Sequence, residues 1–267
     1  MRAIVINTKG GVGKSTAAVQ LVAPYLYQKI NDRVKLVEFD DENKDADTFD
    51  SDILDANQEK VLSGGDLDKS LIDNLINNDD IVIDVGGNKT TTIILDKLGE
   101  TGMSNLIDIA FIPLTDGEQD AINAIKTYNR IKSLNDSIKI VFVLSRVDSN
   151  MDTNLQFINF FGDVDNRIDG RNGLIDKVDD SDKNIVKLYN SDVIKYSRLF
   201  GITAYELAQK DVNELRNKLK QYTIDKDTDK AKKVAYRITI VNRAKKYYDE
   251  VLQKAMQTIN DVTGGVI

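Results

Sequence analysis

The chain has 267 residues and a formal net charge of −7, with neither cysteine nor histidine. This length is sufficient to bury a full core as one α/β domain. The two missing residue types exclude disulfides, thiolate or imidazole metal sites and a histidine general base, so any chemistry must use carboxylates, lysines, hydroxyls, backbone amides and a hard cation. No apolar run approaches the about 20 residues of a membrane span, and no signal peptide is visible, so we expect a cytoplasmic protein.

Short β-branched runs alternate with helical patterns along the chain, which indicates βαβ units and a parallel sheet. We expect strands at residues 2–7, 33–38, 80–84, 107–112 and 138–144, and a weaker one near 184–188. We expect helices at residues 14–30, 67–77, 90–98, 118–133, 191–198, 203–220 and from about 228 to 260. The pattern predicts an α/β fold with a doubly wound, mostly parallel sheet flanked by helices, and a long basic helix at the C-terminal end.

Three segments should interrupt this regular pattern. Pro24 lies inside the first expected helix and should kink it or mark an irregular turn. Pro113 should end the strand at 107–112. Residues 162–184 are rich in Gly, Asp and Asn without a clear period, so we expect an exposed loop or insertion there.

A glycine-rich loop at residues 9–16 separates the first strand from the first helix. Its glycines let the backbone approach phosphate oxygens with N–H groups pointing at them, and the helix that follows adds its positive dipole end. Lys14 should neutralise the β- and γ-phosphates of ATP, and the Ser15 hydroxyl should ligate Mg²⁺. The loop residues expected to hold the nucleotide are Lys9, Gly10, Gly11, Val12, Gly13, Lys14, Ser15 and Thr16.

This loop departs from the common G-x-x-x-x-G-K-[ST] pattern at its start. Thr8 stands where the pattern has its first glycine, and Lys9 adds a second positive charge close to Lys14. One loop lysine is enough to reach the phosphates of a nucleotide held by a single chain. Lys9 is therefore the most informative residue of the loop.

Polar residues gather where the expected strands end. Ligands of open α/β sheets bind outside the carboxyl ends of the strands, so these residues should surround one crevice. The segments concerned are residues 9–16, Asp40, residues 84–88, residues 113–118 and residues 145–148. Their common location independently supports a nucleotide site. Residues 145–148 could contact the purine or form a solvated loop.

Three segments resemble the ParA/MinD family of deviant Walker A ATPases. Residues 9–16 resemble its signature loop, and residues 81–87, Ile-Val-Ile-Asp-Val-Gly-Gly, resemble its Walker B strand and the turn after it. Residues 35–40 resemble the family's second strand, although Glu38 stands where the family usually has the first acid of Asp-x-Asp. The resemblance covers residues 1–150 well and residues 185–208 more weakly.

The resemblance implies roles for individual residues. Lys9 would reach across an ATP-dependent homodimer to the partner's nucleotide. Asp40 would orient or activate the attacking water, and Asp84 would hold Mg²⁺ directly or through its water. Asp41 and Glu42 lie beside Asp40, so any of the three could be the working acid.

The C-terminal part differs from the rest in charge. Residues 226–254 carry 9 basic and 4 acidic side chains, whereas residues 36–80 carry 3 basic and 15 acidic ones. An apolar stripe at helical spacing should pack the long helix on the protein: Val234, Ile238, Val241, Tyr248, Leu252, Ala255 and Ile259. The basic residues away from this stripe form either a solvated face or a contact surface for DNA phosphates: Lys232, Lys233, Arg237, Arg243 and Lys246. Tyr236 and Tyr247 beside them could pack or stack on bases.

These features predict a ParA-like ATPase that dimerises on ATP, binds nonspecific DNA of the nucleoid and supports plasmid or DNA partition. Hydrolysis would be slow and stimulated by a ParB-like adaptor protein. We expect one domain over residues 1–267, with a nucleotide-binding core at 1–150, a variable region at 151–225 and the basic helix at 226–260. The alternatives are a conjugation-associated relative, a binding module without turnover, and a MinD-like membrane-positioning ATPase, for which residues 260–267 are short and weakly apolar.

Overall fold

The structure is a computed structural model that describes residues 1–40, 51–61, 67–163 and 170–265. Seven parallel strands form one sheet in the order β3-β2-β4-β1-β5-β6-β7. The strands are β1 (Arg2–Val5), β2 (Val34–Phe39), β3 (Leu54–Glu59), β4 (Ile81–Val85), β5 (Ile109–Leu114), β6 (Lys139–Val147) and β7 (Ile185–Tyr189). The expected α/β class with a mostly parallel sheet is confirmed.

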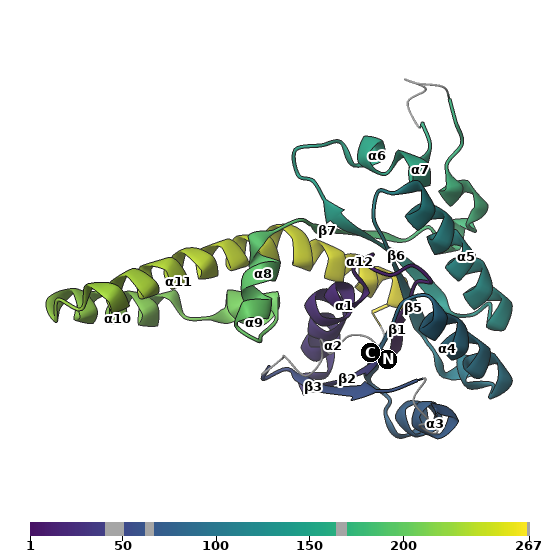
Figure 1. Ribbon diagram of the computed structural model, residues 1–267, viewed down its shortest axis with the longest axis horizontal. Coiled ribbons are helices and arrows are strands. Elements are labelled where there is room, and N and C mark those ends of the chain that lie inside the picture. Colours follow the sequence, from purple (N-terminus) through teal and green to yellow (C-terminus); the bar gives the residue numbers. More distant parts are fainter. Residues whose placement is uncertain (41–50, 62–66, 164–169, 266–267) are drawn as a thin grey trace.

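Helices cover both faces of the sheet (Figure 1). One face carries α3 (Leu67–Asn77), α4 (Lys89–Glu100), α5 (Glu118–Leu134) and α7 (Ile158–Phe161). The other carries α1 (Lys14–Ala17), α2 (Ala23–Ile30), α8 (Asp192–Leu199), α9 (Ala204–Gln209) and α12 (Gln253–Thr263). Each face buries its own apolar cluster, so the strands contribute side chains to a core on both sides, as a central parallel sheet requires.

The first helix is irregular, as Pro24 predicts. A π-helical segment, η1 (Ala18–Val22), joins α1 to α2. In it the N–H of Ala23 bonds the carbonyl of Ala18, five residues earlier. Pro24 follows as one of the first residues of α2, where a backbone N–H has no partner within the helix, so its absence in proline destabilises the helix least.

The expectation for Pro113 is wrong, because this residue lies inside β5. On the β1 side, β5 is paired only through Phe111, so the position of Pro113 lies beyond the end of that ladder. The carbonyl of Pro113 accepts a hydrogen bond from the Asn7 side chain at 2.7 Å. The proline therefore removes no ladder hydrogen bond on this side, which explains how a central strand tolerates it.

Two other expectations need correction. The helix expected at 203–220 is broken at Lys210, and Asp211 caps a new helix, α10 (Val212–Ile224), by accepting from the N–H of Asn213. The segment 162–184 is not wholly exposed in its described part, because Ile175 and Val178 are buried against the core. That part also holds the short 3-10 turns η4 (Leu174–Lys177) and η5 (Asp180–Asp182). The remaining short elements are η3 (Met103–Leu106) and α6 (Thr153–Gln156).

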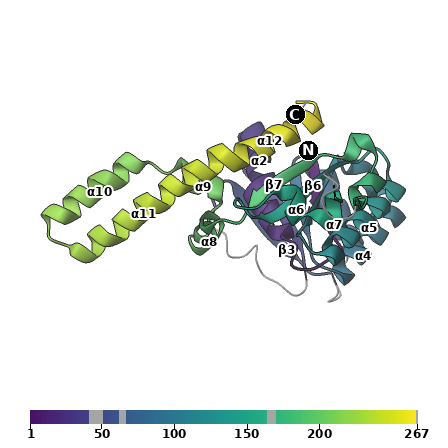
Figure 2. The same cartoon turned by 90° about the horizontal axis from the view of Figure 1, so that it is seen from above.

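The C-terminal helix runs without interruption from α11 (Thr228–Tyr247) through a second π segment, η6 (Tyr248–Leu252), into α12. α10 lies antiparallel against α11, and the pair projects from the body as an arm (Figures 1 and 2). We use "the arm" for residues 212–247. The apolar stripe expected on this helix is largely buried, with Val234 and Val241 in α11 and Leu252, Ala255 and Ile259 beyond it.

Candidate functional site

The glycine-rich loop is fixed at its start by Asn7, a fully buried residue that directly follows the apolar run of the first strand. Its side-chain oxygen accepts from the backbone N–H of Lys9 at 2.8 Å, while its amide nitrogen donates to Pro113. One side chain thus ties the loop to β5. The loop then ends at α1, whose first residue is Lys14.

Gly13 holds the conformation that turns the loop into the helix. Its φ of 95° lies in the left-handed region, which residues with a side chain rarely adopt. A Cβ at this position would lie 2.7 Å from the Ser145 hydroxyl oxygen. Both the backbone angle and the approach of β6 therefore require glycine here.

A cavity of about 270 Å³ opens beside the loop. It is lined by residues from the ends of three strands, β2, β4 and β6, together with the loop, the start of α1 and α8, which is the crevice expected from strand order. The lining residues are Gly10, Gly11, Gly13, Lys14, Ser15, Thr16, Glu38, Asp40, Asp84, Gly86, Gly87, Arg146 and Arg198. Residues 113–118, expected at the crevice, contribute none of this lining.

Lys14 and Asp84 are both buried at this cavity and interact electrostatically. Burial lowers the pKa of Lys14, and the carboxylates of Asp84 and Asp40 oppose that change. The pKa of Asp84 is raised to about 7, mainly by burial and also by the nearby charge of Glu38, while a hydrogen bond from Ser15 opposes the increase. The ammonium group of Lys14 donates to the carbonyl of Lys9 at 3.2 Å.

The chemistry of this group suits a divalent cation. One carboxylate oxygen of Asp84, Oδ1, is buried without a hydrogen-bond partner among the described residues. The Ser15 hydroxyl lies within hydrogen-bonding reach of the same carboxylate. Oxygen donors of this kind are the ligands that Mg²⁺ takes, and its charge would favour the ionised form of Asp84.

Two glycines after β4 bring the site together. The N–H of Gly86 bonds the carbonyl of Phe39 at 2.8 Å, and a Cβ on Gly86 would lie 2.9 Å from the carboxyl carbon of Asp40. A Cβ on Gly87 would lie 3.1 Å from the Cα of Gly10. The turn therefore packs against both the acidic end of β2 and the glycine-rich loop. Asp41 and Glu42, the alternative acids, lie outside the described residues.

Two arginines lie at the cavity: Arg146 belongs to the segment 145–148 that was expected at the crevice, whereas Arg198 was not identified from the sequence. Arg146 adopts a positive φ of 58° and donates to the carbonyl of Gly11 at 3.2 Å. Arg198, near the end of α8, donates to the Thr16 hydroxyl at 2.8 Å. A second cavity of about 220 Å³ adjoins the first, shares these two arginines, and extends along the ends of β6 and β7 past Ser145 and Asn190.

The other candidate residues lie at the surface. Lys9 is exposed, and within the described part of the chain its side chain makes no hydrogen bond or ion pair. The five basic residues considered for DNA contact are all exposed as well. Tyr247 is a packing residue: it is buried and its hydroxyl donates to the carbonyl of Tyr189 at 3.2 Å. Tyr236 is 73% exposed.

Similarity to known proteins covers most of the chain. The model of the CobQ/CobB/MinD/ParA nucleotide-binding domain matches residues 3–200, a span that contains every residue lining the 270 Å³ cavity. A crystal structure of a plasmid partition protein from Borrelia burgdorferi aligns at 18% identity with a TM-score of 0.40, covering 74% of this chain and 95% of that one. No curated protein matches the sequence. None of the helices in the described residues is both long and apolar enough to cross a membrane.

Proposed function

Because the chain belongs to the CobQ/CobB/MinD/ParA family of nucleotide-binding domains, whose members are P-loop NTPases, we propose that it is an ATPase of the ParA type. ATP with Mg²⁺ would occupy the cavity beside the glycine-rich loop, and ATP would bring two chains into a dimer that binds DNA. The observation that carries the proposal is the meeting of Lys14, Asp84 and the Ser15 hydroxyl at one buried end of that cavity. A positive group, an acidic group and a hydroxyl at the end of a phosphate-binding loop match a Mg²⁺–nucleotide complex.

The first test concerns ATP binding. Lys14 would supply the main countercharge for the β- and γ-phosphates, and Mg²⁺ held by Ser15 and Asp84 would neutralise the rest. Lys14→Ala should therefore abolish ATP binding measured by isothermal titration calorimetry. Unchanged ATP affinity in this variant would remove the basis of the proposed site.

The role proposed for Lys9 is supported by its exposure and by its lack of partners in the described part of the chain. A cation that reaches outward from the loop is suited to meet the phosphates held by a second chain. Lys9→Ala should still bind ATP as a monomer but fail to dimerise with a nonhydrolysable ATP analogue, as measured by light scattering. Normal dimerisation would show that Lys9 acts only within its own loop.

Hydrolysis requires a positioned water, and the chain has no histidine to act as a base. Asp40 is supported as the positioning acid because it is buried at the cavity and held close to the β4 turn. Asp40→Ala should keep ATP binding and dimerisation and lose turnover, both basal and stimulated by an adaptor protein. If turnover persists in Asp40→Ala but is lost in Asp41→Ala or Glu42→Ala, the working acid is one of those residues.

The proposed DNA contact rests on the charge of the arm. Residues 212–247 carry 11 basic and 4 acidic side chains, whereas the whole chain is net acidic. Reversing the charge of Lys232, Arg243 and Lys246 together should weaken ATP-dependent binding to duplexes of unrelated sequence and leave dimerisation intact. Equal DNA binding by the variant and the parent would identify the basic face as a solvated surface.

A membrane-positioning role has less support. The apolar side of α12 is buried against the body, with Ile259 fully inaccessible and Thr263 hydrogen-bonded to Tyr25. This side is therefore not available to lie in a bilayer interface. Vesicle binding by the purified protein, with no binding to DNA, would favour the membrane role.

A further inference from the structure

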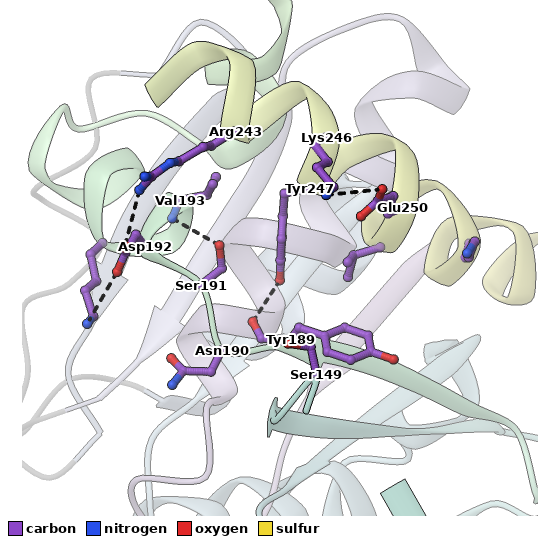
Figure 3. A pocket seen from close by; sticks show the side chains of 13 residues that line it. Ser149, Tyr189, Asn190, Ser191, Asp192, Val193, Arg243, Lys246, Tyr247 and Glu250 are labelled. Carbon is purple, nitrogen blue, oxygen red and sulfur yellow. Dashed lines mark hydrogen bonds and ion pairs between the residues drawn. The ribbon is translucent and has the colours of Figure 1, made fainter. Parts of the chain in front are cut away.

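A second, larger recess lies at the base of the arm, outside the nucleotide cavity. This cleft has a volume of about 750 Å³ and lies between the connection from β7 to α8 on one side and α11 with η6 on the other (Figure 3). Four cationic and two acidic side chains line it: Lys195, Arg243, Lys246 and Lys254, with Asp192 and Glu250. The cleft therefore carries a positive charge that its own acids do not balance.

The ion pairs within the cleft are long. Arg243 and Lys195 both approach Asp192, at 3.6 Å and 3.9 Å, and Lys246 lies 3.8 Å from Glu250 (Figure 3). Exposed pairs of this kind contribute about 0–1 kcal/mol each to stability. An incoming anion can therefore replace either acid as the partner of these cations with little loss of free energy. Lys254 forms no ion pair with any acid of the described residues.

The surroundings of the cleft favour a long polyanion over a small one. Lys232 lies three turns from Arg243 on nearly the same side of α11, and the distance along the helix from Lys232 to Lys254 is about 33 Å at 1.5 Å per residue. This length is close to one turn of duplex DNA, about 34 Å. A free phosphate would fill only a small part of the volume and could not contact all four cations at once.

We propose that this cleft seats backbone phosphates of duplex DNA, and that Lys254 and Lys195 are phosphate contacts in addition to the basic residues already considered on α11. The inference rests on the proposed DNA-binding function and locates part of the DNA contact at the base of the arm. Phosphate contacts of this kind fix the position of a protein on the duplex without reading its sequence. Binding at the cleft is accordingly independent of base sequence.

Lys254 is the residue to test. Lys195 also lines the cavity next to the glycine-rich loop, so changing it would disturb the nucleotide side as well. Lys254 lines only the cleft and a surface groove beside α2. Lys126, an exposed lysine of α5 on the opposite face of the sheet, provides a control with the same change of charge.

The experiment compares Lys254→Glu, Lys232→Glu and Lys126→Glu with the parent in duplex binding at several salt concentrations, with ATP present. Lys254→Glu should weaken binding about fivefold or more near 0.1 M salt and reduce the slope of log K against log salt by about 1, because one phosphate contact is lost. Lys126→Glu should match the parent, and all three variants should keep the parent's ATP affinity.

The possible results separate this inference from the function on which it rests. If Lys232→Glu weakens duplex binding while Lys254→Glu behaves like Lys126→Glu, DNA binds the arm and the cleft proposal is overturned. If the parent binds no duplex, both the DNA function and the cleft proposal are overturned. If inorganic phosphate stabilises the parent against heat but not Lys254→Glu, and the two bind duplex equally, the cleft is a site for a small anion and the proposal is again overturned.

Discussion

Replacing Asp84 with asparagine should stabilise the nucleotide-free protein at neutral and higher pH. The carboxyl group is buried, and burial raises its pKa from 3.8 to about 7. This difference corresponds to about 4 kcal/mol of unfavourable free energy when the group is ionised in the folded state. Asparagine has nearly the same shape and never carries that charge.

The effect of Asp84 on the free energy of unfolding depends on where the pH lies relative to its two pKa values, 3.8 unfolded and about 7 folded. Below about pH 4 the group is protonated in both states, so its ionisation contributes nothing to the free energy of unfolding. Between pH 4 and 7 the unfolded chain releases the proton while the folded chain keeps it, so the free energy of unfolding falls as the pH rises. Above pH 7 the full penalty is present. The advantage of Asp84→Asn over the parent should therefore grow by about 2–3 kcal/mol between pH 5 and pH 8.

Urea unfolding of both proteins across this pH range, with EDTA and without nucleotide, measures the difference directly. The gain should be smaller than the full penalty, because removing Asp84 also takes away a carboxylate that favours the charged form of Lys14. Adding ATP and Mg²⁺ should reverse the order of stability, since only the parent retains the metal ligand. Parallel curves of unfolding free energy against pH for the two proteins would refute the reasoning.

Three further changes test other parts of the structure. Gly13→Ala should prevent ATP binding in a calorimetric titration because of its positive φ and the close Ser145 hydroxyl, whereas Ser145→Ala should bind normally. Arg198→Ala should weaken ATP about tenfold, since a guanidinium at the phosphate cavity can form charge-assisted hydrogen bonds, and Arg198→Lys should recover only part of the loss. Glu206→Ala should lower the free energy of unfolding by about 2–4 kcal/mol, because its buried carboxylate accepts four hydrogen bonds, whereas the exposed Glu214→Ala should change it by less than about 0.5 kcal/mol in the same denaturation assay.

Much of the fold could be predicted because its central strands are short β-branched runs with clear ends. β3 was missed, since its sequence Leu-Asp-Ala-Asn-Gln-Glu lacks such a run and the strand lies at the edge of the sheet, where burial is partial. The break at Lys210 was also missed. There the capping carboxylate of Asp211 ends one helical pattern and starts another within two residues.

The candidate site was predictable to the extent that its residues are local in sequence. The glycine-rich loop is one continuous segment, and Asp40 and Asp84 follow recognisable strands, so the rule that ligands bind at strand ends brings them together. The same rule places the segment of Arg146 at the crevice, although not its hydrogen bond to Gly11, which lies 135 residues earlier. Arg198 reaches Thr16 from a helix 182 residues further along the chain, and no local pattern encodes this contact. The cleft at the base of the arm depends in the same way on where α8 meets α11.

The π segment η6 joins the part of the C-terminal helix that packs on the sheet to the part that enters the arm. A π segment holds one residue more than the α-helix that would replace it. Deleting one residue there would therefore allow a regular α-helix to form across this point, with the helix on either side keeping nearly the same face toward the body. A deletion of one residue inside the regular helix α11 would instead turn the part of the arm beyond it by about 100° around the helix axis. The π segment is thus the point where this helix can change its length by one residue while the basic face keeps its direction relative to the nucleotide cavity.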